Sequence, residues 1–200
     1  MSLAELYRDL FGLSDEQLIR RLTELGEVRP VKKGHLLYRE GEVPSKLTFL
    51  LQGLLRGYFL DASGRDITDC FAFKPGMPAT ACIALGDSAT ISIEALEDSQ
   101  VLELPMSSVL ELMEEYPQLY RLYSTFLLEA LKCHWEVKAA MYQYTAMERY
   151  QWFLRTYPGL YHQVSGKHIA SFLGMTQVTL SRLRRAMREA GQLQAAEGEP

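Results

Sequence analysis

A short helix, a glycine turn and a basic second helix constrain this chain more than any other feature. The segment reads GKHIASFLGMTQVTLSRLRR over residues 166–185. Ala170 is small enough for a second helix to cross close above it, Gly174 suits a sharp turn, and Thr176 can cap the next helix. The apolar residues that would pack the two helices together are Ile169, Leu173, Met175, Leu180 and Leu183. This pattern predicts a helix-turn-helix, a structure whose main use is reading DNA.

The outward face of the second helix carries the chemistry expected of a DNA reader. Its outward residues are Gln177, Val178, Ser181, Arg182 and Arg185. Residues 165–190 hold five basic side chains and one acidic side chain, whereas the whole chain has a net charge of −4. A basic helix on an acidic body is typical of an element that binds phosphate. The alternative, a solvated basic face on a plain helical hairpin, accounts for neither the turn at Gly174 nor the small Ala170.

Composition predicts a globular protein of a reducing compartment. The 200 residues are 48% hydrophobic and 23% charged, which is ordinary for such proteins. The three cysteines, Cys70, Cys82 and Cys133, are widely spaced and form no metal-binding pattern, so we expect free thiols and no metal site. The N-terminus has no signal-peptide pattern and no apolar run reaches bilayer length. We therefore expect a cytoplasmic protein without a membrane partner.

The pattern of the chain changes from helix to strand and back to helix. Residues 3–11 and 14–25 have helical spacing, and the second run begins with a capping-box pattern at Ser14. Between about residues 28 and 104, short β-rich runs alternate with turn residues about every ten positions, which favours an antiparallel sandwich or barrel. We expect strands at residues 48–51, 54–60, 66–71, 90–95 and 100–104. A second capping-box pattern, at Ser108 and Glu111, predicts where helix returns.

A long helix is predicted after Pro117, with apolar residues at steps of three and four. About 25 residues is long for a helix that only packs within its own chain, so we expect a contact between two copies of the chain. The predicted dimer seam consists of Leu122, Phe126, Ala130, Cys133, Val137 and Ala140. Packing of this helix on the β region is the alternative. A further capping box, Thr145 to Glu148, begins the next helix.

In their collinear order, several stretches resemble the Crp/Fnr superfamily of bacterial transcription regulators. The stretches are residues 33–42, 50–58, 64–67, 94–99, 148–158 and 169–182. The resemblance implies an α+β fold in which N-terminal helices and an antiparallel, cyclic-nucleotide-binding-like β-roll occupy residues 1–115. A dimerisation helix would follow at residues 116–143, and a helix-turn-helix domain at residues 144–200.

The same resemblance implies a sequence-specific regulator that binds double-stranded DNA as a homodimer, with RNA polymerase as a further partner. At the matching positions Gln177, Val178, Ser181 and Arg182 would face base edges or nearby phosphates. Arg182 is the candidate for a bidentate contact to guanine. The residues expected to touch phosphates, which position the protein without specifying sequence, are Lys167, Thr176 and Thr179.

Two departures from the family pattern concern the effector and the wing. Cyclic-nucleotide binders of this family place a Glu and an Arg where this chain has Ala81 and Ala89, and no Glu or Arg occurs anywhere between Gly76 and Ile91. We therefore expect no binding of cyclic AMP or cyclic GMP and no other cofactor. A candidate pocket for a different effector would be lined by Gly76, Thr80, Ala81, Ser88, Ala89 and Thr90. After Gly191 the sequence passes into an acidic tail, so the β-hairpin wing is expected to be reduced or absent.

Two other functions compete with a DNA-binding regulator. A small-molecule sensor of the same fold is the nearer one, because the small hydroxyl residues of the 76–91 loop could hold a ligand. A cupin-like enzyme is disfavoured because the β region holds one histidine, His35, whereas cupin chemistry needs clustered ligands. No nucleophile–base motif is present, so we expect no catalytic residues.

Overall fold

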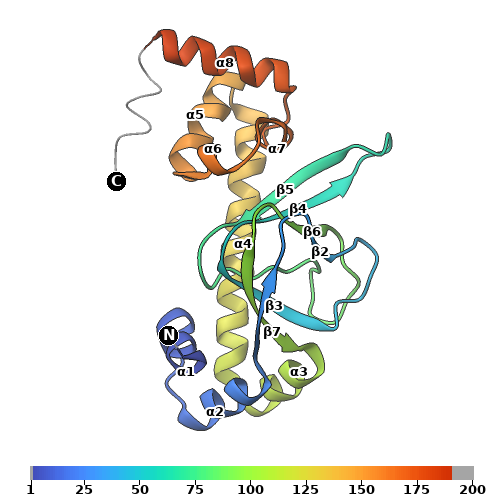
Figure 1. Ribbon diagram of the computed structural model, residues 1–200, viewed down its shortest axis with the longest axis vertical. Helices are drawn as coiled ribbons and strands as arrows, with labels where there is room; N and C mark the ends of the chain where they lie inside the picture. Colours follow the sequence, from blue (N-terminus) through green and yellow to red (C-terminus); the bar gives the residue numbers. More distant parts are fainter. Residues whose placement is uncertain (1, 191–200) are drawn as a thin grey trace. The chain divides into compact units, whose positions relative to one another are not determined.

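The computed structural model describes residues 2–190 (Figure 1). Its contacts group the chain into two compact units. Among the described residues, the first unit comprises residues 2–59 and 69–128, and the second comprises residues 60–68 and 129–190. The boundaries predicted from the sequence follow chain order, whereas these units divide the long helix and group the tip of one β-hairpin with the C-terminal helices. The segment after Gly191, where the wing is expected to be reduced or absent, lies outside the described residues.

The first unit opens with two short helices, α1 (Leu3–Phe11) and α2 (Glu16–Leu25). Helix α1 ends at Gly12, whose φ of 64° is the left-handed conformation that glycine adopts without strain. Helix α2 is capped by Asp15, whose carboxylate accepts hydrogen bonds from two backbone amides of the first turn. The capping box predicted at Ser14 is therefore replaced by a simple Asp cap one residue later.

Two antiparallel sheets form the β-roll of the first unit. Their strands are β1 (Glu27–Val31), β2 (Leu36–Tyr38), β3 (Lys46–Gln52), β4 (Leu55–Leu60), β5 (Asp66–Ala72), β6 (Ser92–Ala95) and β7 (Ser99–Pro105). The three-stranded sheet has the order β1-β7-β3 and the four-stranded sheet the order β2-β6-β4-β5. The registered pairs β1–β7, β3–β7, β2–β6 and β4–β6 are all antiparallel, as predicted.

Two apolar clusters stabilise this unit. One fills the β-roll and is made of Val31, Leu50, Leu55, Ala72, Ala79, Ala81, Ala89, Ile93, Ala95 and Val101. The other joins α1, α2 and α3 (Met106–Glu115) to β3 and β7, with Leu18, Phe49 and Leu112 among its members. Because β7 runs directly into α3, the helix begins without a side-chain cap, and the capping box predicted at Ser108 does not form.

A buried carboxylate links the three strands of the three-stranded sheet. Glu103 on β7 is 5% exposed and accepts hydrogen bonds at 2.6 Å from both Arg29 and Lys46. Burial by itself would raise the pKa of Glu103, but hydrogen bonds from the two cations outweigh it and lower the pKa. The ionised form of Glu103 is therefore part of the folded sheet.

The second unit is helical apart from the tip of the β4–β5 hairpin. Its helices are the C-terminal half of α4 (Pro117–Gln143), α5 (Ala146–Thr156), α6 (Leu160–Gln163), α7 (Gly166–Phe172) and α8 (Gln177–Glu189). The predicted capping box at Thr145 and Glu148 is confirmed at the start of α5. Aromatic rings of Trp152, Phe153, Tyr157 and Phe172 contact one another within this core. The long helix predicted after Pro117 is confirmed at 27 residues.

Candidate nucleic-acid interface

Helices α7 and α8 form the predicted helix-turn-helix. Gly174 has a φ of 60°, so the turn occupies the left-handed conformation that the sequence anticipated. The amide of Met175 donates to the carbonyl of Ala170 at 2.9 Å and closes the turn. The hydroxyl of Thr176 accepts from the amide of Thr179 at 3.1 Å and caps α8.

The two faces of α8 differ sharply. Leu180 and Met187 are buried in the second unit, together with Ile169, Ala170 and Leu173 of the first helix and turn. The opposite face carries the residues predicted to read DNA, and all of them are exposed: Gln177, Val178, Ser181, Arg182 and Arg185. The structure therefore leaves one polar and basic surface of α8 open, which a groove-reading helix requires.

Lys167 is held by an acidic residue from another part of the second unit. Its ammonium lies 3.1 Å from the carboxylate of Asp66, at the start of β5. The neighbouring Ser171 hydroxyl accepts from the amide of Thr68 at 2.9 Å and donates to the carbonyl of Asp66 at 3.3 Å. The candidate phosphate contact at Lys167 therefore has an acid beside it that a DNA phosphate would have to outcompete.

The basic residues of α8 play different roles. The guanidinium of Arg184 lies over the ring of Tyr161, 4.6 Å from its centroid, so this cation supports the fold rather than the open face. Arg185 pairs with Glu189 at 2.7 Å. Arg182 is exposed on the open face of the helix. The charge that α8 presents to a partner is thus smaller than its number of basic residues implies.

Residues of the predicted dimer seam pack within the chain instead of facing outward. Leu122 and Phe126 lie against the core of the first unit, and the Phe126 ring is 5.8 Å from that of Phe49. In the second unit Ala140 is fully buried, and the Cys133 sulfur lies 3.4 Å from the Tyr157 hydroxyl. Leu122, Phe126, Cys133 and Ala140 thus pack within the chain, whereas Ala130 of the predicted seam is exposed and Val137 is half-buried.

A second apolar stripe runs along the opposite face of α4. It consists of Leu128, Leu131, Trp135 and Tyr142, each more than half exposed, and we call it the outer stripe. At about 100° per residue, its members cluster on a face roughly 180° from the predicted seam. Steps of three, four and seven residues keep the outer stripe in line along the helix, as in a coiled-coil seam.

The loop between β5 and β6 folds into the β-roll instead of lining an open site. Ala81 and Ala89 are buried in its apolar cluster. Backbone groups of the loop bond to neighbouring strands and turns: Gly76 donates to Leu50 at 2.8 Å, Ala89 donates to Glu42 at 2.7 Å, and Thr90 donates to Ala81 at 2.6 Å. These amides are already committed to the fold, so they offer no ready nest for an anion.

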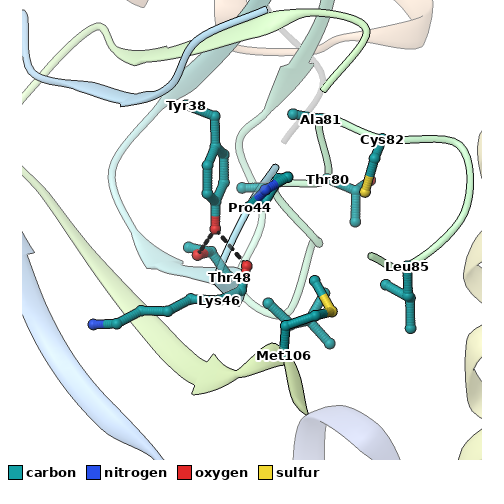
Figure 2. Close-up of a pocket in the computed structure, with 11 residues that line it drawn as sticks. Tyr38, Pro44, Lys46, Thr48, Thr80, Ala81, Cys82, Leu85 and Met106 are labelled. Carbon is teal, nitrogen blue, oxygen red and sulfur yellow. Dashed lines mark hydrogen bonds between the residues drawn. The ribbon is translucent and has the colours of Figure 1, made fainter. Parts of the chain in front are cut away.

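A shallow pocket lies beside this loop (Figure 2). Its lining residues are Tyr38, Pro44, Lys46, Leu47, Thr48, Ala79, Thr80, Ala81, Cys82, Leu85 and Met106. Its empty space is about 200 Å³ with the opening to solvent included. Of the predicted effector-pocket residues it includes Thr80 and Ala81, whereas Gly76, Ser88, Ala89 and Thr90 lie outside the lining.

Three polar side chains of the pocket, Tyr38, Thr48 and Lys46, are already paired. The Tyr38 hydroxyl donates to the carbonyl of Lys46 and shares a hydrogen bond with the Thr48 hydroxyl. Burial raises the pKa of Tyr38 to about 12, so the phenol stays neutral. Figure 2 shows the Lys46 side chain extending away from Cys82 and Leu85, and its ammonium bonds Glu103. The pocket therefore offers a ligand mainly apolar contacts.

Within residues 2–190, no group of three or more His, Cys, Asp or Glu side chains is arranged to hold a metal ion. None of the helices described there combines the length and apolar character needed to cross a membrane.

Comparison with known proteins supports the resemblance found in the sequence. Residues 28–116 match the family described as cyclic nucleotide-binding domain. The transcriptional activator protein Anr of Pseudomonas protegens is 26% identical, over 98% of this chain and 84% of that protein. FixK2 of Bradyrhizobium japonicum superposes with a TM-score of 0.72 at 21% identity, over 83% of this chain and 86% of that one. Over most of its length the chain is similar to transcription regulators of the Crp/Fnr type.

Another Crp/Fnr-type fold is that of CLP of Xanthomonas campestris, described as a c-di-GMP-responsive global regulator. It superposes with a TM-score of 0.73 at 13% identity, over 88% of this chain and 93% of that one. The Crp/Fnr relatives of this chain are transcription regulators and not enzymes, which agrees with the prediction that it is not an enzyme. The α+β fold with a β-roll and C-terminal helices is likewise confirmed.

Some features of this chain could not be predicted from its sequence. Asp66 is about a hundred residues from Lys167, and nothing in the local pattern of either residue links them. The stacking of Arg184 on Tyr161 also joins two residues that are not neighbours in the sequence. The sequence signal for it is an arginine that stands between two buried positions of the helix. The outer stripe has a signal in the sequence, because four large apolar residues recur at helical steps: Leu128, Leu131, Trp135 and Tyr142. The predicted dimer seam lies in the same segment and has the same kind of spacing.

Proposed function

We propose that this Crp/Fnr protein is a homodimeric, sequence-specific regulator that binds duplex DNA through α8 and does not respond to cyclic AMP or cyclic GMP. The observation that carries the proposal is the open face of α8, where Val178, Ser181 and Arg182 are exposed directly opposite the buried Leu180 and Met187. A helix held this way presents its N-terminal half to a major groove.

The exposed polar side chains of α8 suit base edges in different ways. Arg182 can donate two hydrogen bonds to O6 and N7 of guanine, and Gln177 can pair with N6 and N7 of adenine. Thr176 and Thr179 share a hydrogen bond with each other at 2.9 Å, which suits a positioning role near phosphates more than base readout. RNA polymerase is proposed as a further partner on the resemblance alone.

The outer stripe supports the homodimer. It places four large apolar side chains on one face of α4, each of them more than half exposed. Water solvates such a surface poorly. A second copy of α4 carries the same stripe, so a two-fold contact would bury both stripes at once. Two copies of α8 related by that axis would then meet two half-sites of a symmetric DNA sequence.

The buried 76–91 loop supports the absence of a cyclic-nucleotide response. A cyclic phosphate in the β-roll needs a cation and donors, whereas Ala81 and Ala89 supply methyl groups to an apolar cluster. Placing a phosphate there would bury a charge without a partner, which costs several kcal/mol. The loop amides of Gly76, Ala89 and Thr90 cannot compensate because each already donates within the fold.

A small-molecule sensor remains the second candidate. The pocket beside Tyr38 and Cys82 favours it, because this is a concave, mostly apolar space next to the effector loop of the family. Its enclosed space is only about 10 Å³, far below the roughly 300–1,000 Å³ of typical ligand sites, and the hydroxyls of Tyr38 and Thr48 are already paired. In this conformation the pocket has room for about one water-sized group, so a larger ligand would require the loop to open.

Selection from a random duplex pool tests the regulator proposal. The purified protein is expected to enrich sequences with an inverted repeat, because two identical readers would be related by a two-fold axis. The Arg182→Ala variant is expected to relax the enriched pattern at one position per half-site. Arg20→Ala, which removes an equally exposed cation from α2, serves as the matched control and should leave the pattern intact. Failure of the wild-type protein to enrich any sequence would contradict the proposal.

A further inference from the structure

Val178 occupies the most outward position of the first turn of α8. It is 60% exposed, although it is a branched aliphatic residue. At about 100° per residue, Val178 points roughly 180° away from Leu180 and Met187, which are 1% and 3% exposed. It therefore makes no contribution to the core of the second unit and projects toward whatever α8 faces.

The neighbours of Val178 place it at the centre of the open face. Ser181 and Arg182 lie one turn further along the helix and within about 60° of it on either side. Arg185 follows on the same face, two turns from Val178. If α8 enters a major groove, as the proposed function holds, Val178 meets base edges and not the phosphate backbone.

The side chain of Val178 has no donor and no acceptor, which restricts what it can recognise. In the major groove, every base edge presents hydrogen-bonding atoms, and thymine alone adds an apolar group, its C5-methyl. We propose that Val178 is a specificity-determining residue that selects thymine in each half-site by contact with this methyl group. The inference rests on the proposed function, and it adds a base identity that neither Arg182 nor Gln177 supplies.

A chance surface valine is the alternative, because single exposed apolar residues are common on proteins. Helix propensity gives no reason for valine at this position, since alanine, glutamine and arginine all stabilise an exposed helix better. The Val178→Ala variant should therefore fold at least as well as the parent chain, so a loss of binding in that variant would report on DNA contact.

The test removes one methyl group at a time from the DNA. Duplexes are first enriched from a random pool and then resynthesised with each thymine in turn replaced by deoxyuridine. Deoxyuridine differs from thymidine only in lacking the C5-methyl group. When the deoxyuridine replaces one particular thymine per half-site, the affinity of the wild-type protein is expected to fall about fourfold, which is the loss expected when one methyl-sized group is no longer buried. Val178→Ala is expected to bind the thymine and deoxyuridine duplexes alike at that position. Ser181→Ala, a matched truncation on the same face, is expected to keep the wild-type sensitivity.

The outcomes separate this inference from the function beneath it. Two results would overturn the role of Val178 and leave DNA binding standing. One is equal binding of thymine and deoxyuridine duplexes at every position. The other is a loss of affinity for the deoxyuridine duplex that persists in Val178→Ala. Absence of any enriched duplex overturns both. A penalty lost in Val178→Ala and kept in Ser181→Ala supports the contact as proposed.

Discussion

At the scale of single residues, the partners of a cation decide what it can do. Lys167 and Arg184 both count as basic in the sequence, yet one lies 3.1 Å from Asp66 and the other stacks on Tyr161. Neither partner could be predicted, because each comes from a segment distant in sequence. Gly174 and Thr176, by contrast, were predicted correctly because a turn and a helix cap depend on adjacent residues alone.

Asp66 gives the first prediction at this scale. Asp66→Asn should raise affinity for all DNA sequences alike and steepen the salt dependence of binding by up to about one counterion, because Lys167 then faces phosphate without a competing acid. Binding measured over a salt series checks this. Asp61→Asn removes an equal charge from the same hairpin, where Asp61 pairs with Arg65, and is the matched control. Equal effects of the two variants would show that only net charge matters.

At the scale of secondary-structure elements, α4 shows the limit of reading periodicity. Its apolar residues predicted a long helix of about 25 residues, and the structure confirms a helix of 27 residues. They could not decide which of two opposite apolar stripes packs inward, because Phe126 and Leu131 are equally hydrophobic in isolation. The contact between Phe126 and Phe49 settles this within the first unit, and it depends on a strand that precedes α4 by some seventy residues.

The outer stripe yields a prediction about assembly. Leu131→Glu should convert a dimer into a monomer of 22.8 kDa at micromolar concentration, because the new charge would be buried without a partner in the contact. Light scattering gives the mass directly. Gln143→Glu adds the same charge to an exposed position of α4 outside the outer stripe and should remain dimeric. A monomeric wild-type chain, or a dimeric Leu131→Glu variant, would refute the assignment.

The three-stranded sheet yields a prediction about pH. Hydrogen bonds from Arg29 and Lys46 lower the pKa of Glu103 below its ordinary value, so its contribution to stability is present above the unfolded-state pKa of about 4.3. That contribution is lost as pH falls through the lower pKa of the folded state. Glu103→Gln should cost about 1–3 kcal/mol at pH 7 and flatten the pH dependence of urea unfolding in the acidic range. If the Glu103→Gln variant keeps the parent chain's loss of stability at acidic pH, other carboxylates cause that loss.

At the scale of the whole molecule, the overall resemblance could be predicted from the sequence more easily than the interior of the β-roll. Collinear motifs in the sequence pointed to a resemblance to the Crp/Fnr superfamily, and the comparisons support that resemblance. The interior of the β-roll was harder to foresee, because Ala79, Ala81 and Ala89 read as small loop residues yet are buried in an apolar cluster. Burial of this kind depends on how the whole loop folds back onto the strands, which no local pattern records.

The filled β-roll leads to a prediction about effectors. Calorimetric titration with cyclic AMP or cyclic GMP should give no saturable heat at micromolar nucleotide, because the loop lacks two charge-assisted contacts worth about 1.5–3 kcal/mol each. Losing both would move a micromolar site toward millimolar affinity. Saturation at one nucleotide per subunit would show that the loop opens and recognises phosphate through other groups.

The most direct test of the whole account is the affinity of wild-type and Arg182→Ala protein for one enriched duplex and one scrambled duplex, each measured across a salt series. The account predicts that wild-type affinity for both falls steeply as salt rises, since phosphate contacts release counterions. It also predicts that Arg182→Ala weakens the enriched duplex by about 1–3 kcal/mol, roughly 5- to 150-fold, and the scrambled duplex far less. Equal weakening of both duplexes, or wild-type binding that salt does not change, would contradict the claim that α8 reads DNA sequence.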